Sequence, residues 1–488
     1  MILLERHDQL DLGQYCRIAF ERESIRVAPE LLAEVGRSRA SLLALLEAGA
    51  SAYGVNTGLG YLAARPVQEV DQAAFQRSIL AGRATAVGRP LSEPVVRGAM
   101  LLRLTGFLSG YAGVSVELCS LLVDRLNDGW FPVVPGGVSG AAGEIVPLAH
   151  LFLALVDDAV PPYSLGAKEG IALINGAPLA PALSVPLLLR AEALLKHATL
   201  CGALSIAVTR ASARPYVVRV GELKGDPGQL EIHRELMRLL APSGDQLADA
   251  RQAPVSLRVI PQVHGAALDV LDQLRAQLER ELRAVTDSPA FLGPSEDGVE
   301  PEGLYPTGNF HAQALTLQLD SAAIALTQVL NLLEKRLHRL LDSRFSGLPD
   351  QLTSDPGRQS GVVIVHKQAI GLVAQARGLA APATIHALDA SSGQEDIQAH
   401  TLLAAGQLDG VLDALELALA YELVALRQAR FLSGAPLPAA LEQALSVVAD
   451  SVPPVTEDRS LAGDASRVLE LVRSGELVGG VRSVGIWS

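Results

Sequence analysis

The chain has 488 residues, of which 49% are hydrophobic and 19% are charged, and its formal net charge at pH 7 is −13. A chain of this length can bury a large core without disulfides or metals, its composition excludes a disordered tail protein, and its negative charge argues against a nucleic-acid partner. The mean hydropathy of +0.28 leaves two classes, a membrane protein or a helical oligomer that covers much of its surface.

The apolar stretches of the sequence do not resemble membrane spans. Residues 99–123 are interrupted by Arg103 and Glu117, and residues 150–160 are too short to cross a bilayer. The first residues of the chain carry charges where a signal peptide needs an apolar run. We therefore expect a cytoplasmic protein without a membrane partner.

Glycine and proline cluster at five places, and these clusters predict loops between helices. They fall at residues 54–60, 132–143, 221–228, 288–308 and 347–361. We expect residues 1–200 to form a smaller, loop-rich part that carries the active-site loops. Residues 201–488 then hold a central bundle of long helices and the C-terminal helices, within one extended chain fold.

Leucines at spacings of three and four predict long amphipathic helices in the second part of the chain. Such repeats run from Leu271 to Val285, from Leu326 to Leu340 and from Leu408 to Leu426. Strand-like alternation is limited to short segments such as residues 214–220. The fold class predicted from this pattern is mainly α, with long helices packed as a bundle.

Two loops contain the residues that favour chemistry. In the first, Tyr53 precedes three glycines between residues 54 and 60, which allow close backbone approach. Neither a lysine nor a hydroxyl residue follows with phosphate-loop spacing, so Tyr53 is the obvious acid–base group, unless it only packs in the loop. In the second, the small residues between Pro135 and Gly143 open an apolar helix, a pattern that alone would predict a tight helix contact.

The histidines do not show the spacing of metal ligands, and no cysteine accompanies them. We therefore expect no metal site and regard as structural the six histidines His150, His264, His311, His366, His386 and His400.

Taken together, the two loops resemble those of the histidine and aromatic amino-acid ammonia-lyase family. Four further segments match the family in the same order, at residues 167–176, 256–263, 308–312 and 394–396. The resemblance implies a long-helix bundle of the fumarase/aspartase-like type, in a homotetramer whose active sites take residues from more than one subunit. It also implies a carbon–nitrogen lyase that removes the α-amino group and a β-proton from a small amino-acid substrate.

The family's electrophile is a methylidene-imidazolone (MIO), formed when an internal Ala-Ser-Gly cyclises and the serine hydroxyl leaves as water. In this sequence the matching tripeptide is Ala141-Ala142-Gly143. Because Ala142 has no leaving group on its Cβ, we expect no MIO cofactor. Val138-Ser139-Gly140 is another tripeptide that could cyclise, but it lies three residues upstream of the expected place.

The resemblance also assigns roles to individual residues. Tyr53 matches the catalytic tyrosine that takes the β-proton, and Asn175 and Arg258 match positions that hold the substrate carboxylate. A guanidinium suits a carboxylate because it donates two parallel hydrogen bonds. The remaining matches line the site, and they are Asn309, Phe310 and, more weakly, Gln252.

Three positions bear on the substrate. Val255 replaces a tyrosine that the family places beside the imidazolone, so the electrophile and its neighbour are lost together. Arg83 replaces a residue that recognises the substrate side chain, although it could also be a plain ion-pair arginine. Glu395 matches the histidine enzymes, where the phenylalanine enzymes have Gln, and a carboxylate can accept an imidazole N–H.

Three functions fit these observations. The first is an MIO-independent lyase that releases trimethylamine from a trimethylated histidine, either hercynine or ergothioneine, with a site that resembles that of the ergothionases. The second is a catalytically silent homologue that binds a ligand or a sister subunit. The third is a histidine ammonia-lyase with a shifted or engineered MIO, in which Ala142 stands where the natural residue would be serine.

Overall fold

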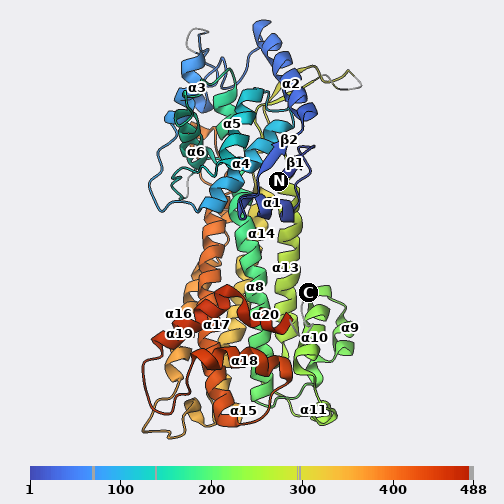
Figure 1. Cartoon of the computed structure of the whole chain (residues 1–488), viewed down its shortest axis with the longest axis vertical. Coiled ribbons are helices and arrows are strands. Elements are labelled where there is room, and N and C mark those ends of the chain that lie inside the picture. The colour runs from blue at the N-terminus through green and yellow to red at the C-terminus, as the bar shows by residue number, and fades with distance from the viewer. Residues whose placement is uncertain (69–71, 138–139, 294, 296–297, 483–488) are drawn as a thin grey trace. The chain divides into compact units, whose positions relative to one another are not determined.

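A computed structural model of the chain describes residues 1–68, 72–137, 140–293, 295 and 298–482. Its residues form two compact units, and helices dominate both, which confirms the predicted mainly α fold (Figure 1). The first unit comprises Met1–Pro186, Arg275–Leu319 and Pro382–Ala405, and the second comprises Leu187–Leu274, Asp320–Ala381 and Gly406–Ser488.

The two units differ from the expected division near residue 200. The chain passes from one unit to the other inside four long helices: α8 (Leu179–Val208), α13 (Ile260–Glu281), α14 (Gln313–Leu340) and α17 (Thr401–Ser433). Because each of these helices has residues in both units, the first unit is completed by segments from later in the sequence.

The first unit consists of short helices and two small sheets. Strands β1 and β2 pair in parallel with Ile2 opposite Ile25, and β3 and β4 pair antiparallel with Ala290 opposite Tyr305. Its elements are β1 (Ile2–Leu4), α1 (Leu12–Ala19), β2 (Ile25–Val27), α2 (Pro29–Glu47), η1 (Gly60–Leu62), α3 (Gln72–Ala81), α4 (Glu93–Leu108), α5 (Val116–Asn127), α6 (Ile145–Asp157), α7 (Glu169–Ile174), β3 (Ala290–Leu292), β4 (Gly303–Tyr305), η5 (Ala383–Ile385) and η6 (Ser391–Gly393).

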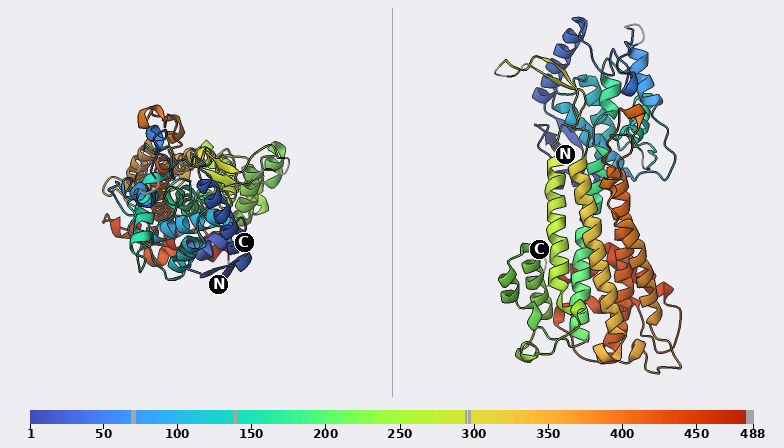
Figure 2. Two further views of the ribbon diagram at one scale, coloured as in Figure 1. Left: turned by 90° about the horizontal axis from the view of Figure 1, so that it is seen from above. Right: turned by 180° about the vertical axis from the view of Figure 1, so that it is seen from behind.

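In the second unit, parts of α8, α13, α14 and α17 lie side by side (Figures 1 and 2). The guanidinium of Arg336 on α14 and the carboxylate of Glu422 on α17 form a buried ion pair of 3.0 Å inside this bundle. The shorter elements are η3 (Arg214–Tyr216), α9 (Val218–Lys224), α10 (Pro227–Leu240), α11 (Gly244–Ala248), α12 (Val255–Arg258), α15 (Ser343–Ser346), η4 (Asp350–Leu352), α16 (Val363–Leu379), α18 (Ala439–Ser451), α19 (Ala462–Ser474) and α20 (Glu476–Arg482).

The long helices follow the leucine repeats of the sequence. Helix α14 has no glycine or proline, so its backbone ladder is uninterrupted. The leucines that repeat between Leu326 and Leu340 are buried, as expected for one face of an amphipathic helix. Helix α17 contains the repeat from Leu408 to Leu426, whereas α13 ends at Glu281, before Val285.

The strand-like pattern at residues 214–220 does not form a strand. The segment divides into η3 and the start of α9. Pro215 has no backbone N–H to donate to a sheet ladder, but it is compatible with the first turn of a helix. The strand suggested by the alternation of apolar residues is therefore wrong for this segment.

One helical stretch is long and apolar enough to span a membrane by length and composition. It runs over Glu169–Val208, a stretch absent from the sequence-based argument, and 83% of its most apolar window is buried within the structure. A helix buried in a protein core can have the same length and apolar composition as a membrane span. This stretch is therefore weak evidence for a membrane span.

Candidate active site

A cavity of about 490 Å³ lies in the first unit. Its volume falls within the range of small-molecule sites, which is about 300–1,000 Å³. Four polar side chains predicted from the sequence as site residues line it: Tyr53, Arg83, Asn175 and Glu395. The rest of the lining is Leu59, Gly60, Ala63, Ala142, Gly143, Ile145, Ile171, Ile174, Ser288, Pro306, Thr307, Phe310, Ser391 and Gln394.

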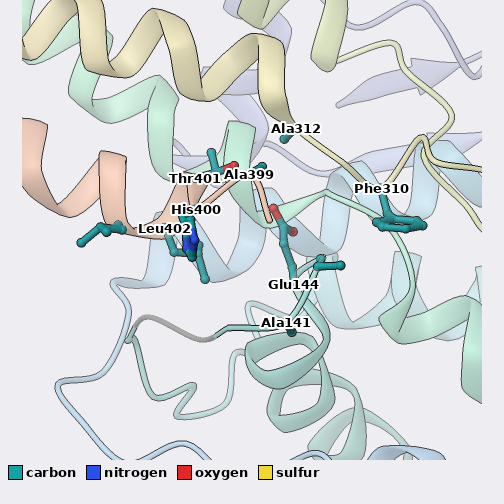
Figure 3. Close-up of a pocket in the computed structure, with 11 residues that line it drawn as sticks. Ala141, Glu144, Phe310, Ala312, Ala399, His400, Thr401 and Leu402 are labelled. Atoms are coloured by element: carbon teal, nitrogen blue, oxygen red, sulfur yellow. The ribbon is translucent and has the colours of Figure 1, made fainter. Parts of the chain in front are cut away.

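The tripeptide Ala141-Ala142-Gly143 precedes α6 and separates this cavity from a smaller one of about 30 Å³. Figure 3 shows Ala141, Glu144 and Phe310 around the smaller cavity, together with the segment from Ala399 to Leu402. Phe310 and residues 142–143 line both cavities. The alternative tripeptide begins at Val138 and Ser139, which lie outside the described residues.

Glu395 is held against the tripeptide. The backbone N–H of Ala142 donates a 2.8 Å hydrogen bond to Oε2 of Glu395. Oε1 has no hydrogen-bond partner among the described residues. Glu395 follows η6, in which Ser391 and Ser392 adopt positive φ angles of 53° and 55°. Such a backbone costs about 1–3 kcal/mol per residue and tends to persist at functional sites.

The loop that carries Tyr53 is fixed by its glycines. The backbone N–H of Gly60 donates a 2.9 Å hydrogen bond to the phenol oxygen of Tyr53. Gly54 has a φ of +69°, and a Cβ there would lie 2.9 Å from the side chain of Leu59. A glycine is therefore required at residue 54 to present Tyr53 to the cavity.

Gln76 anchors this loop to the rest of the site. Its buried amide donates to the carbonyl of Gly54 at 2.9 Å and accepts from the N–H of Gly170 at 3.0 Å. Gln76 thus connects the Tyr53 loop with α7, which ends beside Asn175. Sequence reasoning missed this role, and the one available signal was a glutamine on the helix that precedes Arg83.

Arg83 is half-buried just beyond the end of α3 and lies near two other polar groups of the cavity. Burial lowers the pKa of the Arg83 guanidinium, while the phenol of Tyr53 and the carboxylate of Glu395 raise it. One guanidinium nitrogen donates to the carbonyl of Ile79 at 3.2 Å. Arg83 therefore contacts its own helix and supplies positive charge beside Tyr53 and Glu395.

The other expected site residues are not among those that line this cavity. Asn309 is exposed and is absent from the cavity lining, although its neighbour Phe310 belongs to it. Gln252, Val255 and Arg258 belong to the second unit. There, Nε of Arg258 donates to the carbonyl of Ala253 at 2.9 Å, and Val255 is largely exposed.

Comparison with known proteins identifies the family of the chain. The profile of the family "Aromatic amino acid lyase" matches residues 10–450. The chain belongs to this family.

Its relatives match over nearly the whole chain. The histidine ammonia-lyase of Myxococcus xanthus is 33% identical, over 98% of this chain and 97% of its own. A tyrosine aminomutase from Streptomyces globisporus superposes with a TM-score of 0.89 at 27% identity, over 99% of this chain and 98% of that one. The ergothionase of Treponema denticola gives a TM-score of 0.90 over 98% and 99% of the two chains, but at 23% identity this shows the common fold alone.

In this member of the aromatic amino acid lyase family, a buried carboxylate lies next to the tripeptide. Glu144 accepts hydrogen bonds of 2.6 Å from the N–H groups of Leu179 and Ala180, at the start of α8. A helix N-terminus offers unpaired N–H groups that suit a carboxyl group. Burial nevertheless raises the pKa of Glu144 to about 8.

A second buried group of charges supports α7. Lys168 lies in the left-handed region with a φ of 69° just before this helix. Its ammonium donates to Asp287 at 2.6 Å and to the carbonyl of Ala112 at 2.7 Å. Burial lowers the pKa of Lys168 and raises the pKa of Asp287. Because Asp287 precedes the lining residue Ser288, this ion pair connects two walls of the cavity.

Proposed function

We propose that this chain is a carbon–nitrogen lyase that acts without MIO and releases trimethylamine from a trimethylated histidine-type betaine. One observation supports the proposal: Ala142, which the family resemblance matches to the MIO serine, lines the same cavity as Tyr53, Asn175 and Glu395. The product is the corresponding unsaturated acid of the urocanate type.

The residues at the tripeptide do not fit the family's electrophile. The Cβ of Ala142 is a methyl group, and without a hydroxyl no water can leave to form a methylidene. The Ala142 amide keeps its hydrogen and uses it to hold Glu395 at 2.8 Å. No step of the proposed reaction therefore passes through an imidazolone.

A betaine removes the need for that electrophile. A free α-amino group is a poor leaving group and must be activated, whereas a quaternary trimethylammonium leaves as neutral trimethylamine. It also lacks the lone pair with which an amine would attack a methylidene. A lyase that acts on a betaine therefore needs the base but not the electrophile.

Tyr53 is the proposed base. Its phenolate oxygen takes the β-proton, the electrons of the Cβ–H bond form the Cα–Cβ double bond, and the Cα–N bond breaks toward trimethylamine. The backbone N–H of Gly60 donates a hydrogen bond to this oxygen, and the guanidinium of Arg83 interacts electrostatically with the same phenol.

The substrate carboxylate and ring are assigned to different groups. The amide of Asn175 lines the cavity and, with the guanidinium of Arg258, is proposed to hold the carboxylate. Because the family resemblance implies active sites shared between subunits, we propose that a neighbouring subunit of a homotetramer contributes its copy of Arg258 to the site. Gln252 and Asn309 are proposed to join it at the edge of the site.

Glu395 and Arg83 are proposed to select the ring. Oε1 of Glu395 can accept an imidazole N–H, while Oε2 stays on Ala142. Arg83 faces the same region and can contact the sulfur of a thioimidazole. The histidine ammonia-lyases among the relatives support an imidazole ring.

The test is a parallel assay of the purified full-length chain with histidine, hercynine and ergothioneine, following the ultraviolet absorbance of the acrylate and the amine released. Turnover of a trimethylated substrate but not of histidine supports the proposal. Turnover of histidine indicates an electrophile formed elsewhere. If the chain neither turns over nor binds any of the three compounds, the result supports a silent homologue.

A further inference from the structure

Three side chains with metal-binding atoms come together in the second unit. Glu334 and His338 are four residues apart on α14, so they lie on the same face of this helix. His366 lies on α16. One carboxylate oxygen and one nitrogen of each imidazole lie within 4.8 Å of one another.

The contacts inside this cluster hold the possible metal-binding atoms close together. Nε2 of His366 lies 2.7 Å from Oε1 of Glu334, and the rings of His338 and His366 stack with centroids 4.6 Å apart. The other carboxylate oxygen, Oε2, contacts the ammonium of Lys335 at 2.7 Å. Oε1 and the two imidazoles therefore share one small volume.

Burial is graded across the cluster. The side chains of Glu334 and His366 are 5% and 11% exposed, whereas His338 is exposed. A cation can therefore enter beside His338, and a water molecule can complete its coordination on that side. Tetrahedral zinc, with bonds of about 2.0–2.1 Å, separates its ligand atoms by about 3.4 Å, a spacing that rotation of the exposed His338 ring can reach.

A second polar contact fixes the pairing of the two helices. The guanidinium of Arg377 on α16 donates to Oδ1 of Asn331 on α14, at 2.7 and 3.2 Å. The paired residues run in opposite order along the two helices, so α14 and α16 are antiparallel here. The backbone positions of the three ligands are thus set before a metal binds.

We propose that Glu334, His338 and His366 bind a borderline divalent transition metal, of which zinc is the natural candidate, and that the ion clamps α14 to α16. Two imidazoles and one carboxylate suit Zn²⁺ or Co²⁺ and disfavour Mg²⁺, which prefers an all-oxygen octahedron. The site lies in the second unit, and its test requires no assumption about the lyase reaction.

The experiment is a titration of metal-free, tag-free full-length protein with Co²⁺, followed by its visible absorption, and then displacement by Zn²⁺. We expect one cobalt per chain with the intense visible bands of low coordination number. His338→Ala should weaken cobalt binding by about 100-fold or more. Mutation of a residue that only hydrogen-bonds to a metal ligand already lowers metal affinity by about 10–100-fold.

The matched control is His7→Ala, which removes a histidine of the first unit and should bind cobalt like the unaltered chain. His338→Ala carries the test because the exposed ring can be removed without opening the core, and circular dichroism checks its fold. Absence of cobalt binding at micromolar protein, or equal binding by His338→Ala, would overturn the proposal.

Discussion

The amide N–H of Ala142 and the carboxylate of Glu395 are joined by a 2.8 Å hydrogen bond, although 253 positions separate the two residues in sequence. This bond orients one carboxylate oxygen toward the tripeptide and leaves the other for the cavity. It links Ala142, whose side chain has no hydroxyl, with Glu395, which is proposed to contact the substrate ring.

Replacing Tyr53 by Phe should abolish the proposed elimination. A positioned general base contributes about 10²–10⁴-fold, so turnover of the betaine should fall by at least about 100-fold while its binding changes little. Tyr61→Phe is the control, because that phenol is on the same loop but 70% exposed. Equal turnover by Tyr53→Phe and the unaltered chain would remove Tyr53 from its role.

Glu395→Gln should change ring preference more than rate. Glutamine keeps an oxygen to accept the Ala142 N–H but loses the charge that favours an imidazole N–H. We expect KM for an imidazole betaine to rise by about tenfold, equivalent to about 1.4 kcal/mol, with a smaller change in kcat. Asp396→Asn, an exposed neighbour, is the control. A fall in kcat alone would instead place Glu395 in the chemical step.

The intact mass of the purified chain should equal that of its encoded sequence. Formation of an MIO releases two water molecules, and Ala142 has no hydroxyl to lose. Ala142→Ser restores the hydroxyl and is expected to show partial loss of water, which demonstrates that the assay can detect a ring. A deficit of two waters in the unaltered chain would contradict this prediction and direct attention to Ser139.

Glu144 should make stability depend on pH. Its pKa is raised from 4.5 to about 8 in the folded chain, so between these values the unfolded chain binds fewer protons than the folded one. The free energy of unfolding therefore falls as pH rises through this window, by at most about 1.4 kcal/mol per pH unit.

The measurement is urea unfolding of the unaltered chain and of Glu144→Gln between pH 5 and 9. The difference between the two unfolding free energies should decrease with rising pH and level off above the folded pKa. Glu117→Gln, at an exposed carboxylate, should leave the profile unchanged. A flat difference would mean that Glu144 ionises as readily in the folded chain as in the unfolded one.

Removing one member of the buried Lys168–Asp287 pair should be costly. Asp287→Asn leaves the Lys168 ammonium buried without a counter-charge, which typically costs about 3–5 kcal/mol. The control is Asp157→Asn, at the exposed ion pair with Arg77, where the loss should be below about 1 kcal/mol. Urea unfolding of both variants measures the contrast, and equal losses would show that burial does not decide the cost.

The sequence by itself determined the helical fold and seven of the eighteen residues that line the cavity. Leucines at helical spacing specify α14 and α17, since an apolar stripe must be buried wherever the helix packs. The glycines after Tyr53 and the missing hydroxyl at Ala142 are likewise properties of single residues, so they could be recognised without coordinates.

Tertiary structure decided everything that depends on distant segments meeting. It brought Glu395 to the Ala142 amide, Glu144 to the start of α8, Gln76 between the Tyr53 loop and α7, and His366 to Glu334, because packing and not sequence spacing sets these neighbours. The segment at residues 214–220 shows the converse: its alternation favoured a strand, but Pro215 and local backbone bonds made it helical. Short-range patterns predict elements, whereas sites arise from how the elements are assembled.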